Sequence, residues 1–115
     1  MKKRLTVLLV VAALMLALGV GTAFAVVRVG TNGPDRLVGT AENDTLSGRG
    51  GNDVLVGRGD SDRLLGGTGN DRINATDPGR PEGDLVNCGP GNDRAFIDPG
   101  TEDVVRNCET VIVVR

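Results

Sequence analysis

The chain has 115 residues, of which 18 are glycine and two are phenylalanine, and it contains no histidine, tyrosine or tryptophan. Thirteen basic and 15 acidic side chains give a formal net charge of −2 at pH 7, so the basic footprint of a nucleic-acid-binding protein is absent. Because histidine is missing and Ser47 and Ser61 are the only serines, neither a Ser/His/Asp nor a Cys/His catalytic group can be assembled.

The first 25 residues have the pattern of a secretory signal peptide. Residues 1–4 are a basic start, residues 5–18 are almost unbroken aliphatic, and residues 23–25 have the small-x-small form of a cleavage site. The alternative is an uncleaved membrane anchor, because the apolar character continues through Val27. We expect cleavage, a mature chain that begins near Val26, and no membrane insertion afterwards.

From Gly30 to Asn74 the sequence repeats every nine residues. Five consecutive nonads read GTNGPDRLV, GTAENDTLS, GRGGNDVLV, GRGDSDRLL and GGTGNDRIN, with Gly at position 1, Asp at position 6 and Leu or Ile at position 8. A composition rich in glycine and poor in aromatics also suits a disordered chain, but disorder does not require an aliphatic residue at every ninth position. The pattern favours a short strand around position 8, with one side chain pointing inward, and a turn over positions 1–6.

The repeat continues in broken form after residues 75–78, which do not fit it. Three further nonads, GRPEGDLVN from Gly79, CGPGNDRAF from Cys88 and DPGTEDVVR from Asp98, keep the aspartate at position 6. The last nonad, NCETVIVVR, has Ile112 in that place, so we expect it to cap the stack with an apolar strand. Regular repeats over 30–74 and degenerate repeats with a cap over 79–115 then form one domain of residues 26–115.

The residue types in each nonad suit a calcium site. Aspartate supplies the hard anionic oxygen that Ca²⁺ prefers, alongside carbonyl oxygens at about 2.3 to 2.6 Å. Glycine permits a positive φ and the close approach of backbone carbonyls to an ion, which bulkier residues obstruct.

This pattern resembles the hemolysin-type, or RTX, calcium-binding nonapeptide-repeat family, and GRGGNDVLV and GGTGNDRIN carry the resemblance most fully. The resemblance implies an all-β fold, a right-handed parallel β-roll (β-solenoid), in which two nonads form one turn and Ca²⁺ lies between stacked turns. It places these aspartates on one edge: Asp35, Asp53, Asp71 and Asp93. It places these on the other: Asp44, Asp62, Asp84 and Asp103. The glycines expected at the metal sites are Gly48, Gly51, Gly57, Gly66 and Gly69.

The chain departs from the family pattern at two positions of the nonad. Position 2 is Gly only at Gly67 and is Thr or Arg in the other regular repeats, while position 4 is Glu42 and Asp60 in the second and fourth. We expect some turns to bind Ca²⁺ weakly, and we interpret the extra carboxylates as solvated surface acids.

Folding is expected to depend on the ion. Each nonad buries one aliphatic side chain, and rows of stacked aspartates repel one another unless a cation neutralises them. We therefore expect a largely disordered chain without Ca²⁺ and an ordered β-roll with it.

Cys88 and Cys108 are predicted to form a disulfide. On the β-roll they fall on stacked turns of the same edge, near the Cα separation of about 4.4 to 6.8 Å that a disulfide needs. An extracellular location favours oxidation. Two free buried thiols are the alternative, and two cysteines are too few for a structural zinc site.

We expect a secreted, extracellular protein whose activity is calcium binding. The alternative is an extracellular or cell-surface interaction or adhesion module that uses the calcium-ordered roll as a scaffold for a protein or glycan partner. Its candidate contacts are the outward arginines at position 7: Arg36, Arg63, Arg72 and Arg94. Glycoside cleavage by paired carboxylates is less favoured, because the nonad register already explains the acids.

Overall fold

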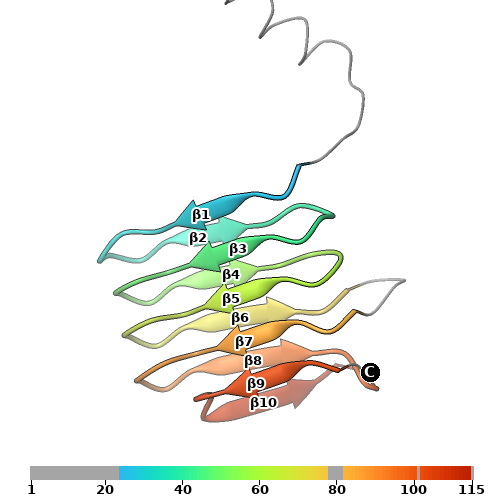
Figure 1. Cartoon of the computed structure of the whole chain (residues 1–115). Coiled ribbons are helices and arrows are strands. Elements are labelled where there is room, and N and C mark those ends of the chain that lie inside the picture. The colour runs from blue at the N-terminus through green and yellow to red at the C-terminus, as the bar shows by residue number, and fades with distance from the viewer. Residues whose placement is uncertain (1–23, 78–81, 101, 115) are drawn as a thin grey trace, which may run out of the picture.

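The computed structural model describes residues 24–77, 82–100 and 102–114, which form short strands stacked in a solenoid (Figure 1). The strands are β1 (Val27–Val29), β2 (Arg36–Val38), β3 (Thr45–Ser47), β4 (Val54–Val56), β5 (Arg63–Leu65), β6 (Arg72–Ala75), β7 (Leu85–Asn87), β8 (Arg94–Ile97), β9 (Val104–Arg106) and β10 (Thr110–Val113). Residues 1–23 of the predicted signal peptide lie outside the described residues. Within the described ranges, no helix has the length and apolar character needed to cross a membrane.

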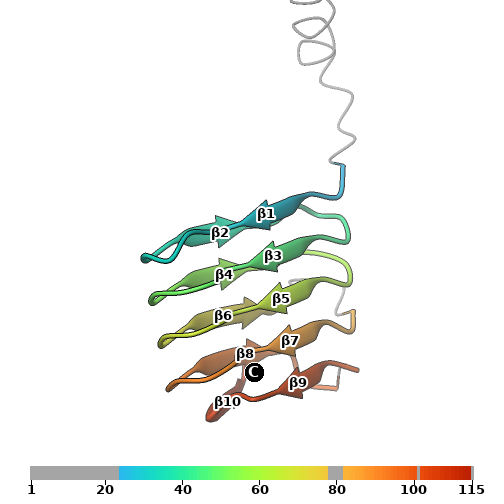
Figure 2. The same cartoon turned by 60° about the vertical axis from the view of Figure 1, so that its left-hand side comes forward.

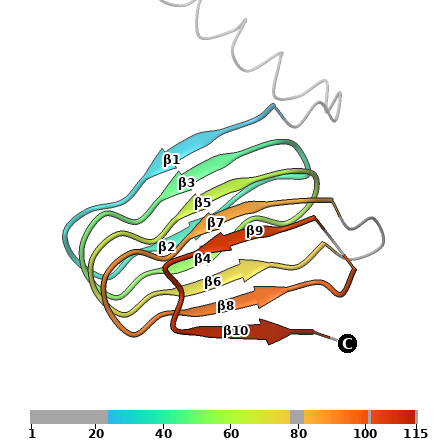
Figure 3. The same ribbon diagram turned by 60° about the horizontal axis from the view of Figure 1, so that its bottom comes forward.

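The strands alternate between two parallel sheets. The odd-numbered strands form one five-stranded sheet in the order β1-β3-β5-β7-β9, and the even-numbered strands form the other in the order β10-β8-β6-β4-β2. Figure 2 shows the resulting stack from the side, and Figure 3 shows the two sheets joined by turns at both edges. The predicted parallel β-roll is confirmed.

The strand register confirms that two nonads make one turn. Leu37 lies opposite Leu55 and Leu46 opposite Leu64, a separation of 18 residues in each case. Ile73, in contrast, lies opposite Ala95, 22 residues further on. The four extra residues thus lengthen the chain between Ile73 and Val86, and the strands on either side keep their register.

The interior is filled by a column of position-8 side chains, because residues alternate in direction along a strand. Leu46, Leu55, Leu64, Ile73, Val86 and Ala95 are fully buried. The same alternation turns position 6 and the next position 1 inward. A buried aspartate therefore precedes each aliphatic residue, and a buried glycine follows Leu46, Leu55 and Leu64. The four position-7 arginines are exposed on the outside, where the guanidinium of Arg72 lies 4.7 Å from the ring centroid of Phe96.

The predicted register of the last nonad is wrong. Thr110 pairs with Arg94, which places Glu109, rather than Ile112, level with Asp93. The Asp93 N–H donates to Glu109 Oε2 at 2.8 Å. The connection from β9 to β10 is only three residues long and contains Asn107 at a φ of 57°, so the chain reverses sooner than a full nonad allows.

The predicted disulfide is confirmed. Cys88 and Cys108 are bonded, with their Cα atoms 5.1 Å apart. Cys88 lies between β7 and β8, and Cys108 lies between β9 and β10, so the bond joins neighbouring turns on one edge of the roll.

Candidate metal centre

The position-6 aspartates form two columns, one along each edge of the roll. The first column, at the turns that lead from odd-numbered to even-numbered strands, contains Asp35, Asp53, Asp71 and Asp93. The second column, at the opposite turns, contains Asp44, Asp62, Asp84 and Asp103. These are the two sets that the sequence predicts. All except Asp35 and Asp103 are buried, which is unusual for a group that is charged at neutral pH.

In every column aspartate except Asp35, one carboxylate oxygen accepts a hydrogen bond from the backbone of the turn before it. In the first column, the Asp53 N–H donates to Asp71 Oδ1 at 2.9 Å, and the Asp71 N–H donates to Asp93 Oδ1 at 2.7 Å. In the second column, the Asp44 N–H donates to Asp62 Oδ1 at 2.8 Å. This ladder of hydrogen bonds from one turn to the next fixes the orientation of the carboxylates from Asp44 onward.

As far as the structure describes the chain, the second carboxylate oxygen has a hydrogen-bond partner only in the first two nonads. The Thr31 N–H donates to Asp35 Oδ2 at 2.6 Å, and the Thr40 N–H donates to Asp44 Oδ2. Both threonine hydroxyls also lie within hydrogen-bond distance of the same carboxylates. Among the described residues, the other Oδ2 atoms of the columns are buried without a hydrogen-bond partner: Asp53, Asp62, Asp71, Asp84, Asp93 and Asp103.

The backbone conformation separates the same two kinds of turn. In the third nonad, Arg49 at position 2 and Gly51 at position 4 have φ values of 71° and 83°, and Gly67 and Gly69 repeat this in the fifth. The fourth nonad and the nonad from Cys88 follow the same pattern, whereas the two Gly-Thr turns do not. Turns with paired positive φ values therefore leave a carboxylate oxygen without a donor, and Gly-Thr turns supply one.

Three position-1 glycines, Gly48, Gly57 and Gly66, lie directly against the unpartnered oxygens of their own nonads. A Cβ on Gly66 would lie 2.7 Å from Asp71 Oδ2 and 2.6 Å from the carbonyl oxygen of Cys88 in the next turn. Gly48 and Gly57 likewise lie against the carboxylates of their own nonads. A carbonyl oxygen and a carboxylate oxygen without a hydrogen-bond donor converge beside Gly66, and these oxygen types fit Ca²⁺.

The other two predicted glycines act through the backbone. Gly51 and Gly69 have positive φ, and a Cβ on either would collide with the turn stacked beside it, at Gly33 and Gly51 respectively. They permit close stacking of the turns, and thus bring successive carboxylates near one another.

Burial raises the pKa of Asp53, Asp62, Asp71, Asp84 and Asp93, and neighbouring carboxylates raise it further. The pKa of Asp62 and of Asp71 is raised to about 7 and that of Asp84 to about 8, although a backbone hydrogen bond opposes the change in each case. A raised pKa means that the environment disfavours the ionised form. A bound cation would reverse this by neutralising the charge that burial penalises.

We expect the metal-free protein to contain more β structure at pH 4 than at pH 8. A carboxyl with a raised folded-state pKa is protonated in the fold where it is ionised in the unfolded chain, so folding takes up protons. The linked stability is present near the ordinary pKa of 3.8 and is lost as the pH rises through 7 to 8. Far-UV circular dichroism of calcium-free protein measures this, and equal spectra at both pH values would contradict it.

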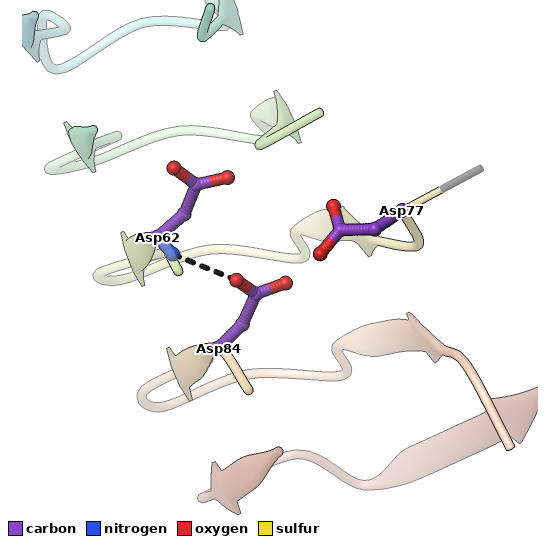
Figure 4. A group of neighbouring side chains, drawn as sticks. All are labelled: Asp62, Asp77 and Asp84. Carbon is purple, nitrogen blue, oxygen red and sulfur yellow. Dashed lines mark hydrogen bonds between the residues drawn. The ribbon is translucent and has the colours of Figure 1, made fainter. Parts of the chain in front are cut away.

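A further carboxylate, missed by sequence reasoning, joins the second column. Asp77 is buried, and one oxygen each from Asp62, Asp77 and Asp84 lies within 4.8 Å of the others (Figure 4). Asp77 belongs to the four residues outside the repeat, so the nonad register gives it no role. In the sequence, the feature that could have pointed to it is an aspartate followed by proline, directly before the nonad repeat resumes at Gly79.

Comparison with known proteins identifies the repeat. The family model described as the RTX calcium-binding nonapeptide repeat matches residues 29–64 and 57–77, in four copies. No curated protein and no solved structure matches the chain.

Proposed function

Because residues 29–77 belong to the RTX calcium-binding nonapeptide-repeat family, we propose that this chain is a secreted calcium-binding protein whose β-roll folds on binding the ion. The observation that carries the proposal is the row of buried carboxylate oxygens without hydrogen-bond partners in the described part of the chain. Burying an ionised carboxylate is costly unless it is paired or coordinates a metal.

The proposed ligands are the aspartates that carry these oxygens: Asp53, Asp62, Asp71, Asp84, Asp93 and Asp103. Backbone carbonyls beside Gly48 and Gly66 complete the donor set. Asp35 and Asp44 are left out, although the sequence pattern includes them, because Thr31 and Thr40 already donate to their second oxygens. The ion would supply positive charge that holds successive turns together.

Three groups of residues have different roles in forming the proposed site. Glycines at positions 1 and 4 allow the turns to stack closely, the backbone ladder orients each carboxylate, and the aliphatic column excludes water from the interior. The turns can stack with their carboxylates side by side only when a cation neutralises the negative charge of those carboxylates. Binding and folding are therefore coupled, as in other small domains whose metal site does not exist in the unfolded chain.

Secretion is part of the proposal. The signal-peptide pattern of residues 1–25 supports it, and so does the Cys88–Cys108 disulfide, because disulfides persist in oxidising extracellular compartments. Calcium-binding modules outside the cell typically have dissociation constants of about 10⁻⁴ to 10⁻³ M. Such a roll would be open in the cytosol and ordered after export. We propose no catalytic role for the chain.

Isothermal titration calorimetry of the purified protein with Ca²⁺ tests the proposal. We expect saturable binding of more than one Ca²⁺ per chain, with half-saturation in the micromolar to millimolar range. Mg²⁺ at the same concentration is the control for simple charge screening, because it dehydrates reluctantly and demands stricter geometry. Absence of saturable Ca²⁺ binding, or an equal response to Mg²⁺, would contradict the proposal.

A further inference from the structure

The connection between β6 and β7 brings a third carboxylate to the second column. Within the described part of the chain, these three side chains are the group of acids whose oxygens lie close enough to share one metal ion. Here Asp77 and Asp84 come from one connection and Asp62 from the turn stacked above it. Figure 4 shows the Asp77 carboxylate facing the carboxylates of Asp62 and Asp84 from the opposite side.

Each member of the cluster has one oxygen held and one oxygen left over. Asp62 Oδ1 accepts the Asp44 N–H at 2.8 Å, Asp84 Oδ1 accepts the Asp62 N–H at 2.7 Å, and Asp77 Oδ2 accepts the Glu82 N–H at 3.3 Å. The opposite oxygens, Asp62 Oδ2, Asp77 Oδ1 and Asp84 Oδ2, are buried without partners among the described residues. The three side chains are 2 to 3% exposed.

Three buried carboxylates held in this way are strongly unfavourable unless a cation joins them. The pKa of Asp77 is raised to about 6 by burial first and then by neighbouring carboxylates, which shows that the cluster resists ionisation. Ligand oxygens on opposite sides of a Ca²⁺ ion lie about 5 Å apart, given bonds of about 2.3 to 2.6 Å, so oxygens within 4.8 Å of one another can share one ion.

We propose that Asp77 joins the column aspartates Asp62 and Asp84 in one divalent-cation site, which binds Ca²⁺ more tightly than the other sites between turns of the roll. This inference rests on the proposed function, because it names one site among those of the roll. Three carboxylates give it more negative charge than a pair of column aspartates provides, and the held oxygens reduce the ordering cost of binding. An ion at this site joins the last regular repeats to the first degenerate repeat, where residues 75–78 interrupt the nine-residue period.

The test compares Asp77→Asn with Glu82→Gln in calorimetric Ca²⁺ titrations. Both variants remove one negative charge from the same connection, but the Glu82 side chain is exposed and contributes only its backbone N–H to the cluster. The wild type should show one tight class of site followed by weaker ones. Asp77→Asn should weaken the tight class at least about tenfold, a loss of about 1.4 kcal/mol, and Glu82→Gln should leave it unchanged.

A second measurement needs no variant and therefore does not depend on whether Asp77→Asn folds. With one equivalent of Ca²⁺ added to the wild type, the NMR amide signals of Asp62 and Asp84 should shift before those of Asp53 and Asp71. First shifts in the first column, or a tight class that Asp77→Asn retains, would overturn the inference and leave calcium binding by the roll intact. No Ca²⁺ binding by the wild type would overturn the proposed function itself.

Discussion

Asp71→Asn should raise the Ca²⁺ concentration for half-maximal folding at least about tenfold, the equivalent of about 1.4 kcal/mol. Asp71 lies in the middle of the first column, where its Oδ1 accepts the Asp53 N–H and its buried Oδ2 has no partner within the described residues. Asparagine retains an acceptor for that N–H but places a neutral NH₂ donor where the second oxygen stood. The variant thus keeps the ladder and removes one metal ligand.

Asp35→Asn is the matched control for this prediction. It makes the same chemical change in the same column, but at a turn where the Thr31 backbone N–H and hydroxyl already serve the carboxylate. The Ca²⁺ midpoint, followed by far-UV circular dichroism, should change by no more than about twofold, since partly exposed hydrogen bonds contribute little net free energy. Equal shifts in the two variants would show that the unpartnered oxygens are not the ligands.

Leu64→Ala should lower the free energy of unfolding in saturating Ca²⁺ by about 2 to 5 kcal/mol, the usual range for a leucine removed from a well-packed core. Leu64 is fully buried in the aliphatic column, between Leu46 above it and Val86 below it in the same sheet. Leu64 also belongs to the same buried cluster as Leu55 and Ile73 of the other sheet, so its truncation leaves a cavity inside the core.

Leu65→Ala tests whether that loss comes from the column or from the strand. Leu65 is the next residue of β5 and points to the outside of the roll, where it is half-buried. Urea denaturation should show a loss of less than about 1 kcal/mol for this variant, because little apolar area returns to water. A similar loss in both variants would mean that the aliphatic column is not the core of the roll.

The nonad register predicts much of this molecule because each position has one physical role. Leucine at position 8, aspartate at position 6 and glycine at position 1 share a strand face, so a nine-residue period fixes which side chains lie inside. The pairing of Leu46 with Leu64 and the ladder from Asp53 to Asp71 both follow from that period once two nonads complete a turn.

The irregular segments were harder to predict, because position in a repeat says nothing about residues outside it. Asp77 reaches the second column only because the longer connection between β6 and β7 turns it inward. Glu109 takes the place of an aspartate beside Asp93 because a shorter connection, rather than the sequence register, sets where β10 begins. Both depend on how the chain closes a turn of unusual length.

The sequence also did not reveal which nonads leave a carboxylate oxygen without a hydrogen-bond donor. Threonine at position 2 stands out only as a departure from the family pattern, and its consequence depends on backbone conformation. In the structure, Thr31 and Thr40 donate to their own aspartates, whereas Arg49 and Arg58 adopt positive φ at the same position. The aspartates of the first turn therefore have partners for both carboxylate oxygens, whereas those of the following turns in the described residues keep one oxygen without a partner.

Far-UV circular dichroism at pH 7.5, recorded first in excess chelator and then in millimolar Ca²⁺, tests the central claim most directly. The buried, unpartnered carboxylates predict a largely disordered spectrum in chelator and a cooperative gain of β structure as Ca²⁺ is added. A chain with the same β content in both conditions would contradict the claim that calcium creates the fold.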